Sequence, residues 1–187
     1  MANELDTLDV KILYQLQLNG RMSITELAKN VGSSRPTITS RLKHLISDEK
    51  AIIHGGLNLE KMGFKMACVG LEVKNKDTRN RVEKILGACP RILNTFRTTG
   101  KANMHIAFWG EKDEIIHSTI ESFRDIENVD IVYSHYLGTP SHGKIMVPIH
   151  PEKKEKTACN KSCSSCERYT IELCVGCPMT KDYKNPF

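Results

Sequence analysis

Seven cysteines are unevenly distributed along the chain, and five of them fall within nineteen residues near its C-terminal end. Their spacing is Cys159-x3-Cys163-x2-Cys166-x7-Cys174-x2-Cys177. Each Cys-x2-Cys pair forms a tight turn that can direct two thiolates at one centre, and Zn²⁺ binds four such ligands at about 2.3 Å in a tetrahedron. Clustered cysteines in a reducing cytoplasm bind metal more often than they form disulfides. The spacing therefore predicts a metal site at Cys163, Cys166, Cys174 and Cys177.

Other chemistry is compatible with the same thiols. The first three cysteines also have the spacing of the radical SAM iron–sulfur motif, but that chemistry needs a large barrel after the motif, and only twenty-one residues follow Cys166. A four-thiolate iron–sulfur cluster stays open, as does a thiol redox switch. A structural or sensing zinc site is the favoured interpretation, with Cys159 as a fifth thiol and further candidate ligand.

A second group of chemically active side chains lies between residues 33 and 46, where the sequence carries no acidic residue. Ile38, Leu42 and Leu45 predict a helix with one apolar face. Its other side carries small hydroxyls, which can approach base edges and phosphates, and cations, which can replace condensed counterions. The expected DNA-binding residues are Ser33, Ser34, Arg35, Thr37, Ser40, Arg41, Lys43 and His44.

The polar side of one helix is weak evidence for DNA binding, because the outer face of any soluble helix is polar. The preceding segments strengthen the interpretation. Asp6 is a candidate N-cap of a first helix that ends at residues 19–20, and residues 23–26 have the spacing of a capping box at the start of a second. A turn and a third helix follow, which Ser34 can cap. Residues 1–60 are therefore expected to form a helix-turn-helix (winged-helix-like) DNA-binding domain.

The net charge of +5 does not by itself identify a DNA-binding protein, since residues 1–60 carry seven Lys and Arg against seven Asp and Glu. Local clustering of cations has to carry that interpretation. The hydrophobic and charged fractions, 40% and 26%, are close to the globular average. No apolar run approaches the ~18 residues of a membrane span, and the first residues do not resemble a signal peptide. We therefore expect a folded, cytoplasmic protein.

Residues 64–138 mix strand and helix patterns. Alternating apolar residues predict strands at 67–73, 92–98, 104–109 and 131–137. Helices are predicted over residues 77–88 and 113–124. The order βαββαβ indicates a ferredoxin-like unit, so the fold class of the chain is α+β. In the second strand, one side is expected to carry Ile92, Asn94, Phe96 and Thr98.

The last part of the chain divides into a linker and a tail. Residues 139–156 are expected to form a strap and a solvated linker, because they are rich in Pro and Gly and end in a charged run. Residues 157–187 have few apolar side chains, so metal binding would supply most of the folding free energy of this Cys-rich tail. The expected domains are thus 1–60, 64–138, the linker 139–156 and the metal-binding tail 157–187.

The first part of the chain resembles the leucine-responsive regulator (Lrp/AsnC) family almost without gaps over residues 5–55. The resemblance is carried by LDTLDVKIL at 5–13, LQLNGR at 16–21, TELA at 25–28, VGSS at 31–34 and RLKHL at 41–45. It implies a transcription regulator rather than an enzyme, with residues 34–46 as the recognition helix for double-stranded DNA. The βαββαβ unit resembles the family's effector-binding and oligomerisation domain, which implies a homodimer and often an octamer.

In that family, small molecules such as amino acids sit between dimers, near the turn that joins the two central strands. The resemblance therefore implies an effector site at Thr99, Gly100 and Asn103. Many relatives carry an aspartate where this chain has Asn103. The substitution removes a charge that could hold an amino group, which argues against an amino-acid effector. A simpler role of Gly100 is to allow a tight hairpin.

The tail lies outside the usual family pattern and looks like the short metal-binding tails of some regulators of archaeal type. The hypothesis is that it binds zinc or an iron–sulfur cluster, senses a soft metal or redox state, and changes DNA affinity through the oligomer. Two rival functions stay open. One is a metal or iron–sulfur enzyme that uses the Cys cluster, and the other is a chromatin-like DNA-binding protein of low sequence specificity.

Overall fold

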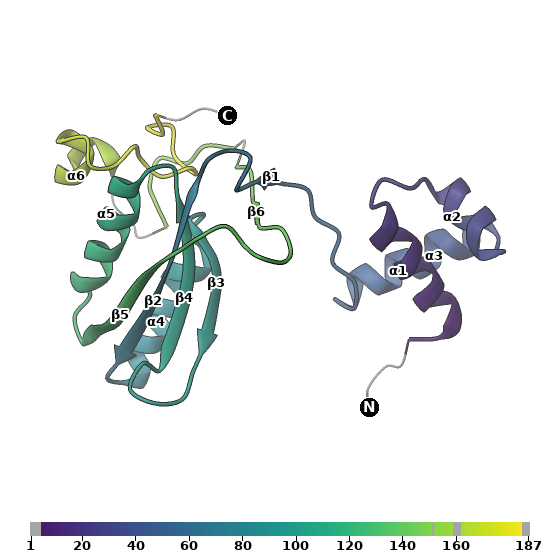
Figure 1. Cartoon of the computed structure of the whole chain (residues 1–187), viewed down its shortest axis with the longest axis horizontal. Coiled ribbons are helices and arrows are strands. Elements are labelled where there is room, and N and C mark those ends of the chain that lie inside the picture. Colours follow the sequence, from purple (N-terminus) through teal and green to yellow (C-terminus); the bar gives the residue numbers. More distant parts are fainter. Residues whose placement is uncertain (1–4, 151, 159–161, 185–187) are drawn as a thin grey trace. The chain divides into compact units, whose positions relative to one another are not determined.

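The computed structural model describes residues 5–150, 152–158 and 162–184. The chain forms two compact units, residues 1–55 and 56–187, and each has its own apolar core (Figure 1). Within the described ranges, no helix is long and apolar enough to cross a membrane.

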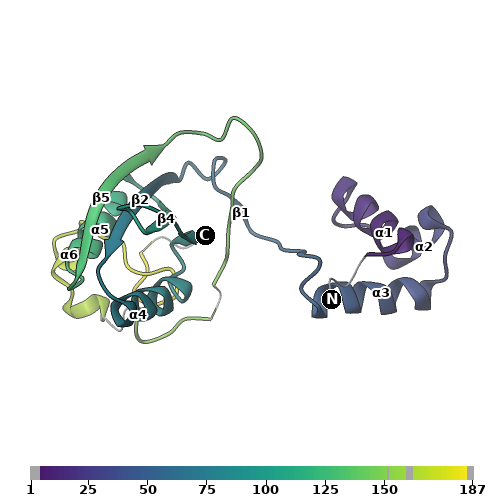
Figure 2. The ribbon, with the colours of Figure 1, turned by 90° about the horizontal axis from the view of Figure 1, so that it is seen from below.

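The N-terminal unit is helical, with α1 (Thr7–Leu18), α2 (Ile24–Val31) and α3 (Arg35–Ser47) (Figure 2). The expected caps are confirmed. The Asp6 side chain accepts from the amide of Asp9 at 2.9 Å, and Ser23 and Glu26 form a reciprocal capping box at the start of α2. α2 ends at Gly32, whose φ of +70° is the left-handed conformation that glycine adopts at least cost.

One apolar cluster holds the three helices together. Its fully buried members are Ile12 of α1, Leu27 of α2 and Ile38 of α3. Since each helix contributes one of these residues, the position of α3 depends on contacts with both other helices. Residues 51–55, which follow α3, contain neither helix nor strand.

The C-terminal unit is built on a four-stranded antiparallel sheet in the order β3-β4-β2-β5. Its elements are β2 (Lys65–Val73), α4 (Lys76–Gly87), β3 (Ile92–Arg97), β4 (Met104–Gly110), α5 (Asp113–Arg124) and β5 (Val129–Leu137). The βαββαβ order confirms the ferredoxin-like prediction, and every element lies within two residues of its expected bounds.

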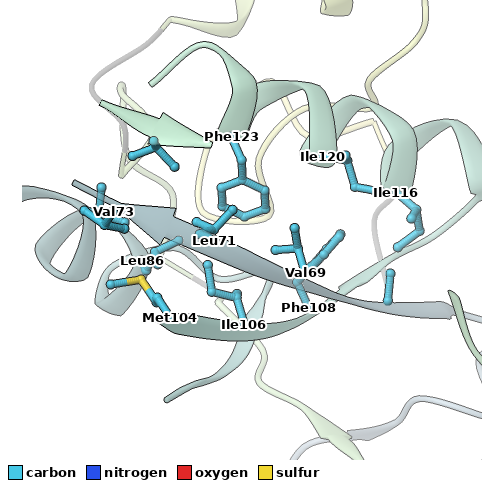
Figure 3. Packing of buried hydrophobic residues seen from close by; sticks show 13 residues of the cluster. Val69, Leu71, Val73, Leu86, Met104, Ile106, Phe108, Ile116, Ile120 and Phe123 are labelled. Atoms are coloured by element: carbon cyan, nitrogen blue, oxygen red, sulfur yellow. The ribbon is translucent and has the colours of Figure 1, made fainter. Parts of the chain in front are cut away.

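The main core lies between this sheet and the helices that cover one of its faces. Figure 3 shows Ile116 and Phe123 of α5 facing Val69 and Leu71 of β2. The rings of Phe108 and Phe123 pack edge to face, with centroids 5.9 Å apart. Burial of these side chains positions α5 and α4, and with them the loop from α4 to β3.

The strand β3 differs from the expectation in the side that it buries. Asn94 is exposed and Phe96 is 53% exposed, although simple alternation placed them in one row with Ile92. A register irregularity between Ile92 and Asn94 changes the pairing with β4. Thr98 lies beyond the end of the strand.

A second, two-stranded sheet joins the start of the C-terminal unit to the segment before the tail. β1 (Leu57–Asn58) pairs antiparallel with β6 (Met146–Val147). Val147 is fully buried in a second apolar cluster that also contains Trp109. The structure thus differs from the expected boundaries: residues 56–60 belong to the second unit, and part of the supposed solvated linker contributes to its core because it carries apolar side chains.

The tail packs on the C-terminal unit. Between residues 162 and 184 it contains the short helices η1 (Cys163–Ser165) and α6 (Glu167–Thr170). Arg168 of α6 donates to the hydroxyl of Ser122 at 2.7 Å and to the carboxylate of Asp125 at 2.9 Å, at the end of α5. Figures 1 and 2 both show α6 beside α5.

Candidate DNA-binding helix and thiol cluster

Two of the hydroxyls that were expected to contact DNA form hydrogen bonds within the first turn of α3. Ser34 accepts from the amide of Thr37 at 3.2 Å, and the two side-chain oxygens lie 2.7 Å apart. Pro36 lies in the first turn, where its missing N–H costs least. These contacts define where the helix begins, and they leave Ser34 and Arg35 exposed.

The exposed surface of α3 carries most of the other residues expected to bind DNA. Arg35, Ser40, Lys43 and His44 are exposed, whereas Ser33 is half-buried. Because residues 33–46 include no acidic side chain, no carboxylate on this helix opposes the approach of a phosphate. Such exposed cations can replace counterions along a DNA backbone.

Arg41 lies in a different environment, between α3 and the start of α1. Its Nη1 atom is 2.6 Å from the Asp6 carboxylate and 3.4 Å from that of Asp9. The amide of Asp9 has the largest effect and lowers the pKa of the Asp6 carboxyl. Desolvation acts in the opposite direction, and the charge and hydrogen bond of Arg41 add to the lowering. Arg41 therefore connects α3 to α1, and carboxylates of its own unit already balance its charge.

The turn between β3 and β4 contains the residues expected to bind an effector. Thr99 and Gly100 are exposed, and Gly100 has a φ of +95°. Asn103 bonds within the fold: its Oδ1 accepts from the amide of Val73 and its Nδ2 donates to the carbonyl of Val73, both at 3.0 Å. An asparagine amide fits this role because it offers both an acceptor and a donor, and an aspartate has no donor when ionised.

The four paired tail cysteines line one cavity of about 480 Å³, enclosed by the tail, α4 and α5. They are Cys163, Cys166, Cys174 and Cys177. Cys159, the fifth candidate ligand, lies outside the described residues. A different fifth thiol lines the same cavity: Cys89, from the loop between α4 and β3. No sequence pattern indicated Cys89, since more than seventy residues separate it from the tail pairs.

The two Cys-x2-Cys turns are linked to each other through Thr180. In the first turn, the amide of Cys166 donates to the carbonyl of Cys163 at 3.0 Å. Thr180 is buried, and its Oγ1 lies 3.7 Å from the Cys163 sulfur. The same hydroxyl donates to the carbonyl of Cys177 at 3.0 Å. Thr180 thus links the two turns, and both pairs line the same cavity.

Burial has the largest effect on the thiols of the second pair. It raises the pKa of Cys174, and it raises the pKa of Cys177 to about 11. The amides of Gly176 and Met179 hydrogen-bond the two sulfurs and act in the opposite direction. Among the described residues, no three Cys, His, Asp or Glu side chains converge closely enough to hold a metal ion. The sulfurs surround the cavity, so metal binding would have to draw them together and displace protons.

A buried ion pair beneath the tail is the second feature that no sequence pattern indicated. Arg91 and Glu111 lie 2.5 Å apart, with side chains only 8% and 4% exposed. Burial works against the charged form of Arg91, but the Glu111 carboxylate outweighs it and the pKa of Arg91 is raised. Arg91 also donates to the carbonyl of Gly176 at 2.8 Å, and so fixes the second Cys-x2-Cys turn to the domain.

Comparison with known sequences identifies the type of helix-turn-helix domain in the N-terminal unit. Residues 5–46 match the profile of the AsnC-type helix-turn-helix domain. The HTH-type transcriptional regulator Ptr1 of Methanocaldococcus jannaschii is 35% identical over 101 residues, which cover 52% of this chain and 66% of that protein. The HTH-type transcriptional regulator FL11 of Pyrococcus furiosus is 27% identical over 158 residues, which cover 83% of this chain and 97% of that protein.

Solved structures share the fold. Escherichia coli AsnC has a TM-score of 0.64 at 22% identity, and the match covers 78% of this chain and 99% of that chain. A transcriptional regulator from Neisseria meningitidis, solved as an L-Met complex, has a TM-score of 0.65 at 24% identity and covers 78% and 97%. Each of these matches leaves about a fifth of the present chain uncovered. The chain thus combines an AsnC-type helix-turn-helix domain with a fold shared by solved Lrp/AsnC regulators, and the relatives with which it aligns are transcription regulators rather than enzymes.

Proposed function

We propose that the protein is a cytoplasmic, sequence-specific regulator that reads double-stranded DNA with α3 and works as a homodimer or as an octamer built from four dimers. The observation that carries the proposal is the exposed set of cations and hydroxyls on α3, on a helix without acidic residues from 33 to 46, within a domain of AsnC type. A two-fold assembly would present two copies of α3 to half-sites about one helical turn apart.

In this proposal the exposed cations of α3 contact phosphates, and its exposed hydroxyls approach base edges. Arg35, Lys43 and His44 are the proposed phosphate contacts. Ser40 is the hydroxyl proposed to approach a base edge. It is exposed, whereas the Ser34 and Thr37 hydroxyls bond to each other at the start of the helix. Arg41 acts mainly by positioning α3, since it pairs with Asp6.

The test uses a duplex that the wild-type protein selects from a random pool. Lys43→Ala is expected to weaken binding and to lower the magnitude of the log K versus log salt slope by about 0.9 for each lost phosphate contact in each copy of the chain. Lys29→Ala, which removes an exposed cation from α2, is the matched control and should leave the slope unchanged. An unchanged slope for Lys43→Ala would remove α3 from the proposed interface. Equal affinity for selected and random duplexes would support a chromatin-like binder instead.

We propose that the turn at Thr99, Gly100 and Asn103 is the effector region in the oligomer. The Neisseria meningitidis regulator with the same fold was solved with L-Met. In this chain Asn103 is engaged by Val73 and carries no charge, which favours an effector without a free amino group. A thermal-shift survey of free amino acids and their keto-acid counterparts tests this: stabilisation by an amino acid alone would contradict it.

We also propose that the tail binds zinc through Cys163, Cys166, Cys174 and Cys177, with Cys159 as a further candidate, and that metal loading changes DNA affinity through the oligomer. The support is the arrangement of the four paired thiols around one cavity, with Thr180 between the pairs. Bound zinc would supply a cross-link between two turns that are otherwise held by few apolar contacts.

Elemental analysis of anaerobically purified protein, with its visible absorption, tests the metal. About one zinc per chain and no colour supports the proposal. Iron with sulfide and a brown colour would replace zinc by a redox-sensing cluster, and a metal-free tail would favour a thiol switch. The double variant Cys163→Ser/Cys174→Ser tests sensing: if its DNA affinity and metal response equal those of the wild type, the regulatory role of the tail is abandoned.

A further inference from the structure

The carboxylate of Asp6, at the start of α1, uses its two oxygens for different partners. Oδ1 accepts from the amides of Leu8 and Asp9, both at 2.9 Å, and so caps the helix. Oδ2 lies 2.6 Å from Nη1 of Arg41 on α3. One oxygen therefore serves the fold of α1, and the other serves an ion pair with the helix proposed to read DNA.

This ion pair borders the surface of α3 that is proposed to face DNA. Asp6 and Arg41 line a recess of about 390 Å³ together with Ser40 and His44, which are both exposed and lie one helical turn apart. The other lining residues are Asp9, Leu45 and Lys50. Double-stranded DNA carries about one negative charge per 1.7 Å of its axis. A duplex that contacts Ser40 and His44 therefore brings phosphates close to the Asp6 carboxylate.

The cations of this recess already face carboxylates. Arg41 lies 2.6 Å from Asp6 and 3.4 Å from Asp9. Lys50 pairs with Asp48 at 3.4 Å. The side chain of Asp9 is only 11% exposed, whereas those of Asp6 and Arg41 are 46% and 40% exposed. Asp6 is therefore the accessible carboxylate beside Arg41, and its charge opposes the approach of a phosphate. Because an exposed ion pair contributes little to stability, its removal should leave the fold intact.

We propose that Asp6 limits the affinity of the protein for DNA, because its carboxylate occupies Arg41 and keeps that cation from the DNA backbone. This inference rests on the proposed role of α3 and adds to it a residue from another helix. Phosphate binding then depends on cations such as Arg35 and Lys43, which are exposed. Without the charge of Asp6, the guanidinium of Arg41 has donors left for a phosphate, since it carries five N–H groups and Asp9 does not use them all.

Asp6→Asn separates the two roles of Asp6, because asparagine caps a helix as well as aspartate does but carries no charge. The full-length variant and the wild type are titrated with the selected duplex at several salt concentrations. We expect Asp6→Asn to bind several-fold more tightly and to increase the magnitude of the log K versus log salt slope by up to about 0.9 for each copy of the chain. Asp6→Asn/Arg41→Ala should lose this increase. Glu49→Gln, which removes the same charge from an exposed position outside the recess, is the matched control and should leave the slope unchanged.

The outcomes separate this inference from the proposed function. If Asp6→Asn binds like the wild type while Lys43→Ala lowers the slope, the role of Asp6 is overturned and α3 stays the DNA-binding helix. A gain that persists in Asp6→Asn/Arg41→Ala, or that Glu49→Gln reproduces, would also overturn it, because Arg41 would then not be the cation that Asp6 withholds. If neither Asp6→Asn nor Lys43→Ala changes the slope, both proposals fail. If Asp6→Asn does not fold, Asp6→Ser supplies a second uncharged cap and is judged by the same criteria.

Discussion

At the scale of single residues, Arg41 and Lys43 show that neighbouring cations on one helix have different uses. Lys43 is exposed, whereas Arg41 pairs with Asp6 and Asp9 at the start of α1. Sequence periodicity identifies both as polar positions of α3, but it cannot show that α1 delivers two carboxylates to one of them. The distinction depends on the packing of helices and becomes visible only in three dimensions.

We predict that Arg41→Ala lowers the thermal stability of the N-terminal unit by a few degrees, because Asp9 loses the cation beside its largely buried carboxylate. Lys43→Ala, the matched control, should leave the stability within experimental error and weaken DNA binding instead. NMR-detected melting of the α1 amides measures the first effect. The assignment fails if Lys43→Ala destabilises the unit more than Arg41→Ala does.

The pH dependence of the same unit follows from two caps. The amide of Asp9 lowers the pKa of Asp6 from its ordinary 3.8, and the amide of Ser23 lowers that of Glu26 from 4.5. Groups whose pKa is lower in the folded state stabilise it above the ordinary values, and this stability is lost as pH falls through the folded values. The melting temperature of α1 and α2 should therefore decrease as the pH is lowered below about 4.5. In the double variant Asp6→Asn/Glu26→Gln, the decrease in melting temperature at acid pH should be smaller than in the wild type. An equal decrease in both proteins would assign the pH dependence to other groups.

At the scale of elements, the local signals of the sequence were sufficient for nearly all of the fold. Capping residues set the starts of α1, α2 and α3, and alternating apolar residues set the strands of the ferredoxin-like sheet. The failures are non-local. The buried side of β3 depends on a register irregularity, the pairing of residues 57–58 with 146–147 joins segments far apart, and the place of Cys89 depends on tail docking.

Arg91 and Glu111 supply a test of how the elements hold the tail. Glu111→Gln leaves the buried Arg91 without its counterion, and breaking such a pair costs about 3–5 kcal/mol of unfolding free energy. The double variant Arg91→Met/Glu111→Gln removes both charges and should recover part of that loss. Urea unfolding followed by the fluorescence of Trp109, over which Arg91 lies, measures both. A double variant less stable than Glu111→Gln would show that the contact of Arg91 with Gly176 matters more than the ion pair.

At the scale of the whole molecule, the N-terminal unit and the C-terminal unit have separate cores, and the tail belongs to the second. In the proposed function, a signal from the tail would therefore act first on the ferredoxin-like domain, on which the tail packs. The tail therefore packs on the ferredoxin-like domain without contributing to the core that positions α3.

Removal of residues 157–187 tests this independence. We predict that the truncated protein keeps the NMR spectrum of α1, α2 and α3, while its C-terminal unit melts at a lower temperature and self-associates. The reason is exposure of the apolar cavity wall that includes Ile85 and Phe123. Size-exclusion chromatography and calorimetry measure the change, and a truncated protein with full stability would show that the tail adds nothing to the domain.

The short pairing of β1 with β6 has a mechanical consequence. β1 begins two residues after the N-terminal unit ends, and β6 lies ten residues before the tail, so the strands carry the chain into and out of one domain side by side. Force applied to the N-terminal unit would reach this two-stranded sheet, whose register comprises only two residue pairs, before it reaches the four-stranded sheet. We therefore expect the pairing of β1 with β6 to open under tension before the longer pairings of the main sheet, which would lengthen the connection while that sheet stays closed.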